Sequence, residues 1–197
     1  KENNLHVVDC KNSRIQLFSS TGDFIRTWGK EGNDNMGFDT PWGITIDYKG
    51  DVYVADWGNN RVQKFSADGT YLLSYGTSGD PAAALNHPAH VAVDSDGDVY
   101  ITDWGNNRVQ IYEPDGEIIA SLCGDATDYS KAGLYLLNRD PESIKTIRQN
   151  PEPMQYLATF GRPTGISINK NNQIIIADTR GRLQIYNKDI DYIEPPA

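Results

Sequence analysis

The residues best suited to chemistry are three histidines, His6, His87 and His90, and an acidic string from Asp94 to Asp98. His87 and His90 could offer two nitrogen ligands, but a metal site of the zinc type needs three or four. The acidic string is superficially like a calcium loop, yet neither its glycine nor a glutamate falls where an EF-hand loop requires them. A hairpin turn explains the string without a metal. We therefore predict no metal ion and no cofactor.

The common patterns of enzymatic catalysis are missing from this chain. There is no Gly-x-Ser-x-Gly, no cysteine–histidine nucleophile arrangement and no phosphate-binding loop. No catalytic residue is assigned, and the sequence favours a protein that is not an enzyme.

One eight-residue motif occurs twice without a change. Asp-Trp-Gly-Asn-Asn-Arg-Val-Gln at residues 56–63 returns letter for letter at 103–110, and weaker copies begin at Asp9 and Asp178. An aspartate and an arginine recur in every copy, whereas a catalytic residue is expected in one copy only. We therefore predict two structural ion pairs that contribute to the specificity of packing. They are Asp56 with Arg61, and Asp103 with Arg108.

The aromatic residues of the repeats are the candidates for ligand binding. Trp57 and Trp104 either cover the rim between repeats or form an aromatic platform for a ligand. His90 stands where two other repeats have glycine, Gly43 and Gly165, so it places an imidazole where only backbone is expected. We predict a ligand-binding set of four residues: Trp42, Trp57, His90 and Trp104.

These side chains must be positioned by short strands. The repeat aspartates Asp9, Asp56 and Asp103 follow one another at intervals of 47 residues, and Asp178 follows after 75, so the last interval carries an insertion of 28. Each full unit shows four short runs rich in β-branched and aromatic residues, separated by Gly-Asp or Asp-Gly turns. The predicted strands are 43–47, 52–56, 61–65 and 71–75 in the second unit, and 90–94, 99–103, 108–112 and 117–122 in the third.

The repeated pattern Pro-x-Gly-Ile-x-Ile-Asp, then Val-Tyr-Val-Ala-Asp-x-Gly-Asn-Asn-Arg-Val-Gln, resembles NHL repeats. The resemblance implies an all-β chain, a β-propeller of NHL type that is usually six-bladed. About four blades are expected, as an arc of such a ring, within one propeller segment over 1–197. The first unit lacks its innermost strand, and the fourth has a weak candidate outer strand near 190–193. Because an open arc exposes blade faces, the chain is interpreted as a fragment; completion by a second copy is the alternative.

The segment 125–161, between the third and fourth units, is expected to be a helical insertion. Ser130 could cap a helix over 131–138, and Asp140-Pro141 could begin a second over 141–149. It is either a lid over apolar blade surface or an element that docks a partner. Strand alternation places this insertion on one face with the Trp-Gly-Asn-Asn loops and the starts of the inner strands, opposite the Asp-Gly turns.

Charge and composition limit the partners. The formal net charge of −9, from 18 basic and 27 acidic residues, disfavours nucleic acid and anionic membranes. No apolar run reaches the roughly 20 residues that a membrane-spanning helix needs, and the first residues do not resemble a signal peptide. Cys10 and Cys123 are expected to be free thiols, which leaves the compartment undecided.

The function that this sequence favours is non-enzymatic: a binding or scaffolding propeller that engages a protein, a peptide or a small ligand on its loop face. The alternative is a lyase or hydrolase at the channel mouth, with part of its site in further blades. NHL-fold amidating lyases use histidines from several blades, but Gly43 and Gly165 occupy the matching positions here. RNA binding, which some tripartite-motif NHL proteins show, is less favoured because the chain is acidic.

Overall fold

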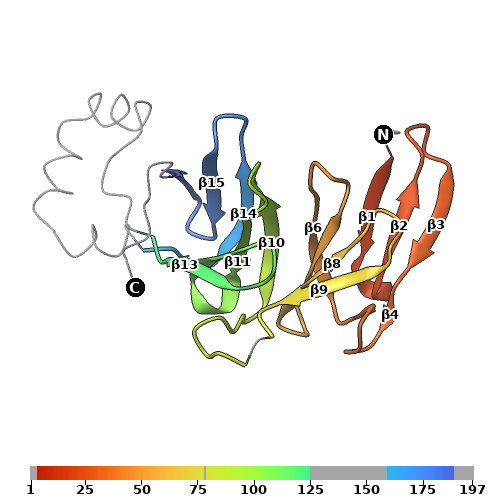
Figure 1. The fold of residues 1–197 in the computed structure, drawn as a ribbon, viewed down its shortest axis with the longest axis horizontal. Coiled ribbons are helices and arrows are strands. Elements are labelled where there is room, and N and C mark those ends of the chain that lie inside the picture. The colour runs from red at the N-terminus through yellow and green to blue at the C-terminus, as the bar shows by residue number, and fades with distance from the viewer. Residues whose placement is uncertain (1–3, 78, 125–158, 189–197) are drawn as a thin grey trace, which may run out of the picture.

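The computed structural model describes residues 4–77, 79–124 and 159–188, and these residues form four antiparallel sheets arranged side by side in an arc (Figure 1). Each sheet is one blade. Blade 1 has three strands, β1 (Leu5–Asp9), β2 (Arg14–Phe18) and β3 (Phe24–Trp28). Blade 2 has four, β6 (Pro41–Ile46), β7 (Val52–Asp56), β8 (Arg61–Phe65) and β9 (Tyr71–Tyr75).

Blade 3 also has four strands, β10 (Pro88–Val93), β11 (Val99–Asp103), β12 (Arg108–Tyr112) and β13 (Ile118–Leu122), and blade 4 has β14 (Pro163–Ile168), β15 (Gln173–Asp178) and β16 (Arg182–Asn187). Two short strands, β4 (Lys30–Glu31) and β5 (Gly37–Phe38), pair in parallel in the connection from blade 1 to blade 2. Single 3-10 turns, η1 (Cys10–Asn12) and η2 (Trp104–Asn106), follow β1 and β11.

The predicted fold is confirmed: the described strands form an all-β arc of propeller blades and no closed ring. The predicted strands of the second and third units match β6 to β13 within two residues at each end. Within the described residues, blade 1 shows no inner strand, as expected, and β1 is the edge of its sheet. The helices expected over 131–138 and 141–149, and the strand expected near 190–193, lie outside the described residues.

Local sequence explains the hairpins. The carboxylate of Asp47, at the end of β6, accepts hydrogen bonds of 2.9 Å from the main-chain N–H groups of Lys49 and Asp51. The side chain thereby closes the turn that Gly50, with φ of +94°, allows the backbone to make. Asp94 closes the corresponding turn of blade 3 in the same way.

The hydrophobic core lies between the blades rather than within them. We call the face of a blade that points to the preceding blade its leading face, and the opposite one its trailing face. Alternate residues of the second and third strands form each face. Val52, Val54 and Phe65 on the leading face of blade 2 are 0% exposed, packed against Ile15 and Leu17 of blade 1. Blades 2 and 3, and blades 3 and 4, enclose two equivalent clusters.

Phe160 shows where the last blade begins. The sequence placed this residue at the end of the insertion, but it is 2% exposed and packs in the cluster between blades 3 and 4. Phe38 and Leu85 hold the same place before the inner strands of blades 2 and 3. No described helix is long and apolar enough to cross a membrane.

Candidate binding surface on the loop face

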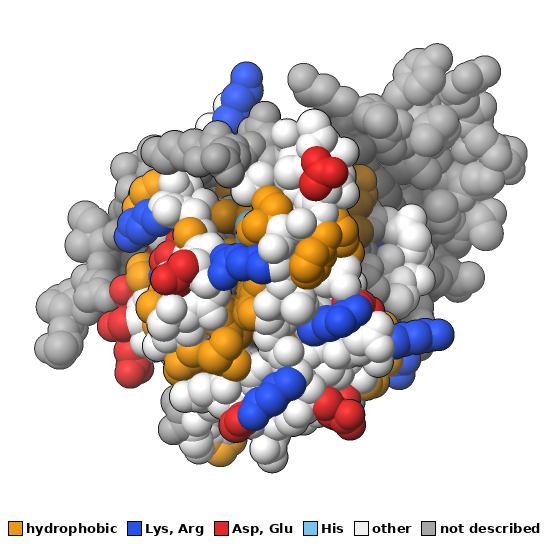
Figure 2. Space-filling view, turned by 90° about the vertical axis from the view of Figure 1, so that its right-hand side faces the viewer, with side chains coloured by type: hydrophobic (Ala, Val, Ile, Leu, Met, Phe, Trp, Pro, Cys, Tyr) orange, Lys and Arg blue, Asp and Glu red, His pale blue; other side chains and the backbone are white. Residues whose placement is uncertain are grey.

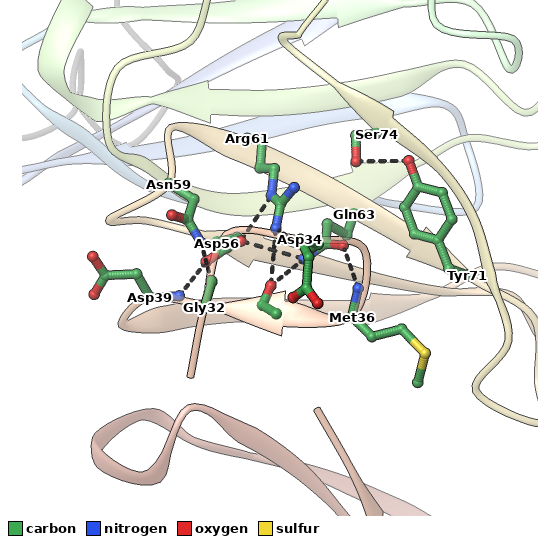
Figure 3. A network of polar contacts seen from close by, with 11 residues as sticks. Gly32, Asp34, Met36, Asp39, Asp56, Asn59, Arg61, Gln63, Tyr71 and Ser74 are labelled. Carbon is green, nitrogen blue, oxygen red and sulfur yellow. Dashed lines mark hydrogen bonds and ion pairs between the residues drawn. The ribbon is translucent and has the colours of Figure 1, made fainter. Parts of the chain in front are cut away.

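The repeated aspartate–arginine pair anchors the chain between consecutive blades (Figure 3). The carboxylate of Asp56 is fully buried and accepts from the Nε of Arg61 at 2.9 Å and from the amide of Asn59 at 2.9 Å. Its other oxygen accepts from the main-chain N–H of Asp39 at 2.7 Å. Burial raises the pKa of Asp56, although these donors act in the opposite direction. The carboxylate is therefore an internal part of the fold and not a solvent-facing acid.

The arginine of the pair extends the network to the segment that connects blade 1 to blade 2. Arg61 donates to the carbonyl oxygens of Asp34 and Gly37 at 2.8 and 2.9 Å, and Gln63 donates to Gly37 at 2.7 Å (Figure 3). Gly37 is buried, and leaving its carbonyl without a donor would cost about 1–3 kcal/mol. The network thus fixes the connecting segment and the start of the inner strand that follows it.

The same arrangement recurs in blades 3 and 4. Arg108 pairs with Asp103 at 2.8 Å and donates to the carbonyl of Ala84 at 2.7 Å. Arg182 pairs with Asp178 at 3.0 Å. Because the arginines of blades 2, 3 and 4 each donate to the connection that precedes their blade, the geometry supports the proposal that these residues are structural.

Beside these anchors, aromatic side chains from successive loops form a continuous row. The rings of Trp42 and Trp57 lie 5.4 Å apart, measured between centroids, and that of His87 lies 4.0 Å from Trp57. Trp104 follows at 6.2 Å from Trp57 and 6.4 Å from His87. The guanidinium of Arg162 stacks on Trp104 at 4.2 Å from its centroid. We call these five residues the tryptophan row.

The row draws on equivalent places in three blades. Trp57 and Trp104 lie in the loops after β7 and β11, whereas His87 and Arg162 precede the prolines that begin β10 and β14. Trp42 is the second residue of β6. The chain therefore brings the loops between second and third strands next to the starts of the inner strands, which is the juxtaposition that strand alternation requires.

His87 is held in place by strained backbone and a neighbouring blade. Its φ is +54°, an uncommon value for a residue other than glycine. Its main-chain N–H donates to the side-chain oxygen of Asn60, in the loop of blade 2, at 2.9 Å. Thr40, at the same place in blade 2, has a φ of +52°, so this bend is a feature of the repeat. The hydrogen bond keeps the imidazole against the ring of Trp57.

The row presents both apolar surface and hydrogen-bonding groups. Trp42 is 44% exposed, and Trp57 and Trp104 are partly exposed. The indole N–H of Trp57 is buried and has no acceptor among the residues that the structure describes. Within the described residues, no carboxylate lies at ion-pair distance from Arg162. The surface therefore offers indole faces next to a guanidinium.

Of the four residues predicted to bind a ligand, the structure brings Trp42, Trp57 and Trp104 together and places His90 elsewhere. The half-buried imidazole of His90 lies among inner strands, with Nδ1 3.1 Å from the carbonyl oxygen of Ile166 in β14. A Cβ atom on Gly43 would lie 2.6 Å from its ring, so β6 is also close. Burial lowers the pKa of His90. A ligand role for His90 remains a prediction that is separate from the row.

Sequence reasoning considered His87 only as a possible metal ligand, and it placed neither His87 nor Arg162 in the ligand-binding set. Both immediately precede the proline of an inner strand, as Thr40 does in blade 2, and this shared position is the signal that could have identified them. The repeated eight-residue motif could not identify His87 and Arg162, because neither residue belongs to it.

The acidic string forms the hairpin turn between β10 and β11 that the sequence predicts. Its three carboxylates, from Asp94, Asp96 and Asp98, all lie within 2.7–2.8 Å of the ammonium of Lys188. Burial lowers the pKa of Lys188, but the three carboxylates together raise it well above its ordinary value. In the described residues, no group of three or more His, Cys, Asp or Glu side chains could hold a metal ion.

A model of a known repeat family matches three of the blades. The NHL-repeat model matches residues 38–65, 85–112 and 160–186, which run from the preceding connection into the third strand of blades 2, 3 and 4. The resemblance seen in the sequence is therefore confirmed. No curated protein matches the chain.

Solved structures share the fold. A streptogramin B lyase has a TM-score of 0.55 at 19% identity, over 95% of this chain and 52% of its own. A catalytically inactive virginiamycin B lyase from Staphylococcus aureus, with quinupristin, has a TM-score of 0.56 at 14% identity. The match covers 100% of this chain and 54% of the lyase. The WD40 propeller domain of Doa1 has a TM-score of 0.60 at 12% identity, and the match covers 96% of this chain and 48% of that domain. The chain thus spans about half the length of these propellers, and such identities show the fold alone.

Proposed function

We propose that this NHL-repeat propeller is a non-enzymatic binding protein whose loop face engages a protein or peptide through the tryptophan row. The observation that carries the proposal is the continuity of the row, in which five side chains from three blades stack at 4.0–6.4 Å. Repeat scaffolds commonly bind through loops that a rigid framework positions.

The chemistry of the row suits a polypeptide partner. Tryptophan and arginine dominate the binding energy of protein interfaces, because they bury large areas and still form hydrogen bonds. A partner residue with an apolar or aromatic side chain would pack on Trp42, the most exposed indole of the row. A carboxylate of the partner would pair with Arg162. The row therefore selects a segment in which an apolar side chain lies close to an acidic one.

The rigidity of the surface favours binding further. Asp56 and Asp103 anchor the loops that carry Trp57 and Trp104, and Asn60 fixes His87. Because these loops are already ordered, a partner loses little affinity to ordering them.

A peptide-display selection on the immobilised full chain tests the proposal. Peptides that bind the native protein are expected to lose about tenfold or more in affinity when Trp42→Ala or Arg162→Ser is introduced. Tyr48→Ala is the matched control, since Tyr48 is a 66% exposed aromatic residue on the turn between β6 and β7, outside the row. Binding that survives both row substitutions and is lost with Tyr48→Ala would assign the partner to the opposite face.

A further inference from the structure

The residues just before the inner strands of blades 2, 3 and 4 lie beside the tryptophan row and differ in charge. Blade 2 has Asp39 two places before the proline of its inner strand, and blade 3 has Asn86 at the same place. Blade 4 has Gly161 at that place, followed by Arg162. An acidic, a neutral and a basic group therefore follow one another from blade 2 to blade 4.

The carboxylate of Asp39 is held against the loop that carries Trp57. The main-chain N–H of Gly58, the next residue of that loop, donates to the carbonyl oxygen of Asp39 at 2.8 Å. A Cβ atom on Gly58 would collide with the carboxylate, so glycine leaves the room that the Asp39 side chain fills. Asp39 is exposed, and its carboxylate makes no ion pair within the described part of the chain. The negative charge at this end of the row is therefore accessible.

Blade 3 repeats these contacts with a neutral side chain. The main-chain N–H of Gly105 donates to the carbonyl oxygen of Asn86 at 2.8 Å, and a Cβ atom on Gly105 would collide with the Asn86 carboxamide. The main-chain N–H of Asn86 donates to Asp103, as that of Asp39 donates to the aspartate of its own blade, at 2.7 Å in both cases. An uncharged side chain therefore suffices for the fold at this place, and the charge of Asp39 is available to a partner.

Blade 4 places positive charge at the other end of the row. Gly161 has no side chain, and the stem of Arg180 lies where a Cβ atom of Gly161 would be, 2.8 Å from that position. The main-chain N–H of Arg162 donates to the hydroxyl oxygen of Thr179 at 3.1 Å. The guanidinium of Arg162 stacks on Trp104 at 4.2 Å from the ring centroid. Two arginines therefore stand where blade 2 has a carboxylate.

This order of charges differs from the pattern at the blade 1 end of the molecule. Figure 2 views that end and shows Lys and Arg side chains interspersed with Asp and Glu side chains around hydrophobic ones. Interspersed charges of both signs are usual on a protein surface. The row has a carboxylate at one end and guanidinium groups at the other, so it is electrostatically polar along its length.

The distances along the row set the length of segment that both ends can contact. Asp39 lies against the residue that follows Trp57, the ring of Trp57 lies 6.2 Å from that of Trp104, and the guanidinium of Arg162 lies 4.2 Å from Trp104. An extended chain advances about 3.3–3.6 Å per residue, so roughly three to four residues cover these contacts. A basic and an acidic residue separated by about three apolar residues would match the two ends.

Building on the proposed function, we propose that the tryptophan row binds an extended peptide with a basic residue at one end and an acidic residue at the other. The basic residue pairs with Asp39 in blade 2, the apolar side chains between them pack on the tryptophans, and the acidic residue pairs with Arg162 in blade 4. Complementary charges fix the register of a complex, and like charges disfavour the wrong one. The order of charges thus sets the orientation of the peptide on the blades.

Four pools of fluorescent peptides with blocked termini test the proposal on the full chain. In every pool two flanking residues enclose three varied apolar residues, and both chain directions are present. The flanking residues are Lys and Glu, Gln and Glu, Lys and Gln, or Gln and Gln. The Lys–Glu pool is expected to bind most tightly in fluorescence anisotropy, and its advantage over the Gln–Gln pool should shrink as salt is added.

Two substitutions assign each charge of the peptide to one end of the row. Asp39→Asn is expected to weaken binding of the Lys–Glu pool about two- to fivefold more than that of the Gln–Glu pool, the range typical of an exposed ion pair. Arg162→Gln is expected to weaken the Lys–Glu pool by a similar factor relative to the Lys–Gln pool. The matched controls are Asp115→Asn and Lys170→Gln, at exposed turn residues of the opposite face, and they should change no pool.

The outcomes separate this inference from the proposed function. Thermal unfolding checks that each variant folds, and Asn86 shows that an amide fits the place of Asp39. Equal binding of the Lys–Glu and Gln–Gln pools, lost in Trp42→Ala, would overturn the inference and leave the proposed function standing. So would equal weakening of the Lys–Glu and Gln–Glu pools by Asp39→Asn. Absence of binding by every pool would also overturn it, whereas display-selected peptides that depend on Trp42 would still support the proposed function.

Discussion

Replacing Asp56 by alanine should destabilise the protein strongly, and much more than the same change at Asp9. The two residues occupy the same repeat position and each pairs with an arginine at 2.8–2.9 Å. They differ in their surroundings, because the carboxylate of Asp56 is 0% exposed and that of Asp9 is 20% exposed. Their comparison isolates what burial between blades adds to the pair.

The structure sets the size of the effect. Asp56→Ala leaves the Arg61 guanidinium without its carboxylate in a buried site, a change that typically costs about 3–5 kcal/mol. It also removes the acceptor of the Asp39 main-chain N–H, which anchors the connection from blade 1. For a chain of this length, each kcal/mol lowers Tm by about 2–4 °C, so a fall of about 6–20 °C is expected. At Asp9, water can replace the lost acceptor, and the fall should be clearly smaller.

Thermal unfolding followed by circular dichroism, with urea unfolding as a second measurement, checks this prediction. Peptide binding provides the control for a purely structural role. Peptides selected for binding to the tryptophan row should still bind the folded Asp56→Ala variant at low temperature. Equal destabilisation by the two substitutions would mean that burial between blades is not what makes the pair important. An unchanged Tm with abolished peptide binding would show that Asp56 belongs to the binding surface.

Three further predictions follow from the packing between blades. Gly43→Ala should destabilise the chain by about 1–3 kcal/mol, because its Cβ would lie 2.5 Å from the carbonyl oxygen of Ala89. Gly165→Ala, whose Cβ would meet only Ala177 at 3.7 Å, should be tolerated, and urea unfolding of both variants compares them directly. Burial lowers the pKa of His90, so the unfolded chain takes up a proton first as the pH falls below about 6.5; stability should be full above that pH and decline toward the folded-state pKa. The slope of Tm against pH should be smaller in His90→Gln, and an identical slope would contradict the assignment. Lys188→Met should lower Tm, because three carboxylates would lose their shared cation; a higher Tm would show that desolvation of the ammonium outweighs its ion pairs.

The strands and their order could be predicted from the sequence because their signals are local. Val52-Tyr53-Val54-Ala55-Asp56 is a β-branched and aromatic run that ends at a turn, and its copies recur in phase at a fixed spacing. The recurrence of the Asp–Arg pair indicated a structural role, since repetition of a motif is visible without coordinates. The incomplete first unit was also visible in the sequence, since no Pro-x-Gly-Ile-x-Ile-Asp pattern stands before Asp9 in the given residues.

The candidate binding surface depends on distances between blades, which no local pattern encodes. His87 and His90 are three residues apart, yet the backbone bend at His87, with φ of +54°, directs the first imidazole to the tryptophans, while the second lies in β10 against Ile166. Lys188 meets the carboxylate of Asp94 across 94 residues of sequence. Leu5 and Val52 hold the same repeat position with similar side chains, but one is 59% exposed and the other is 0% exposed. Burial is a property of the neighbouring blade, so identical repeat positions acquire different roles only when the blades are assembled.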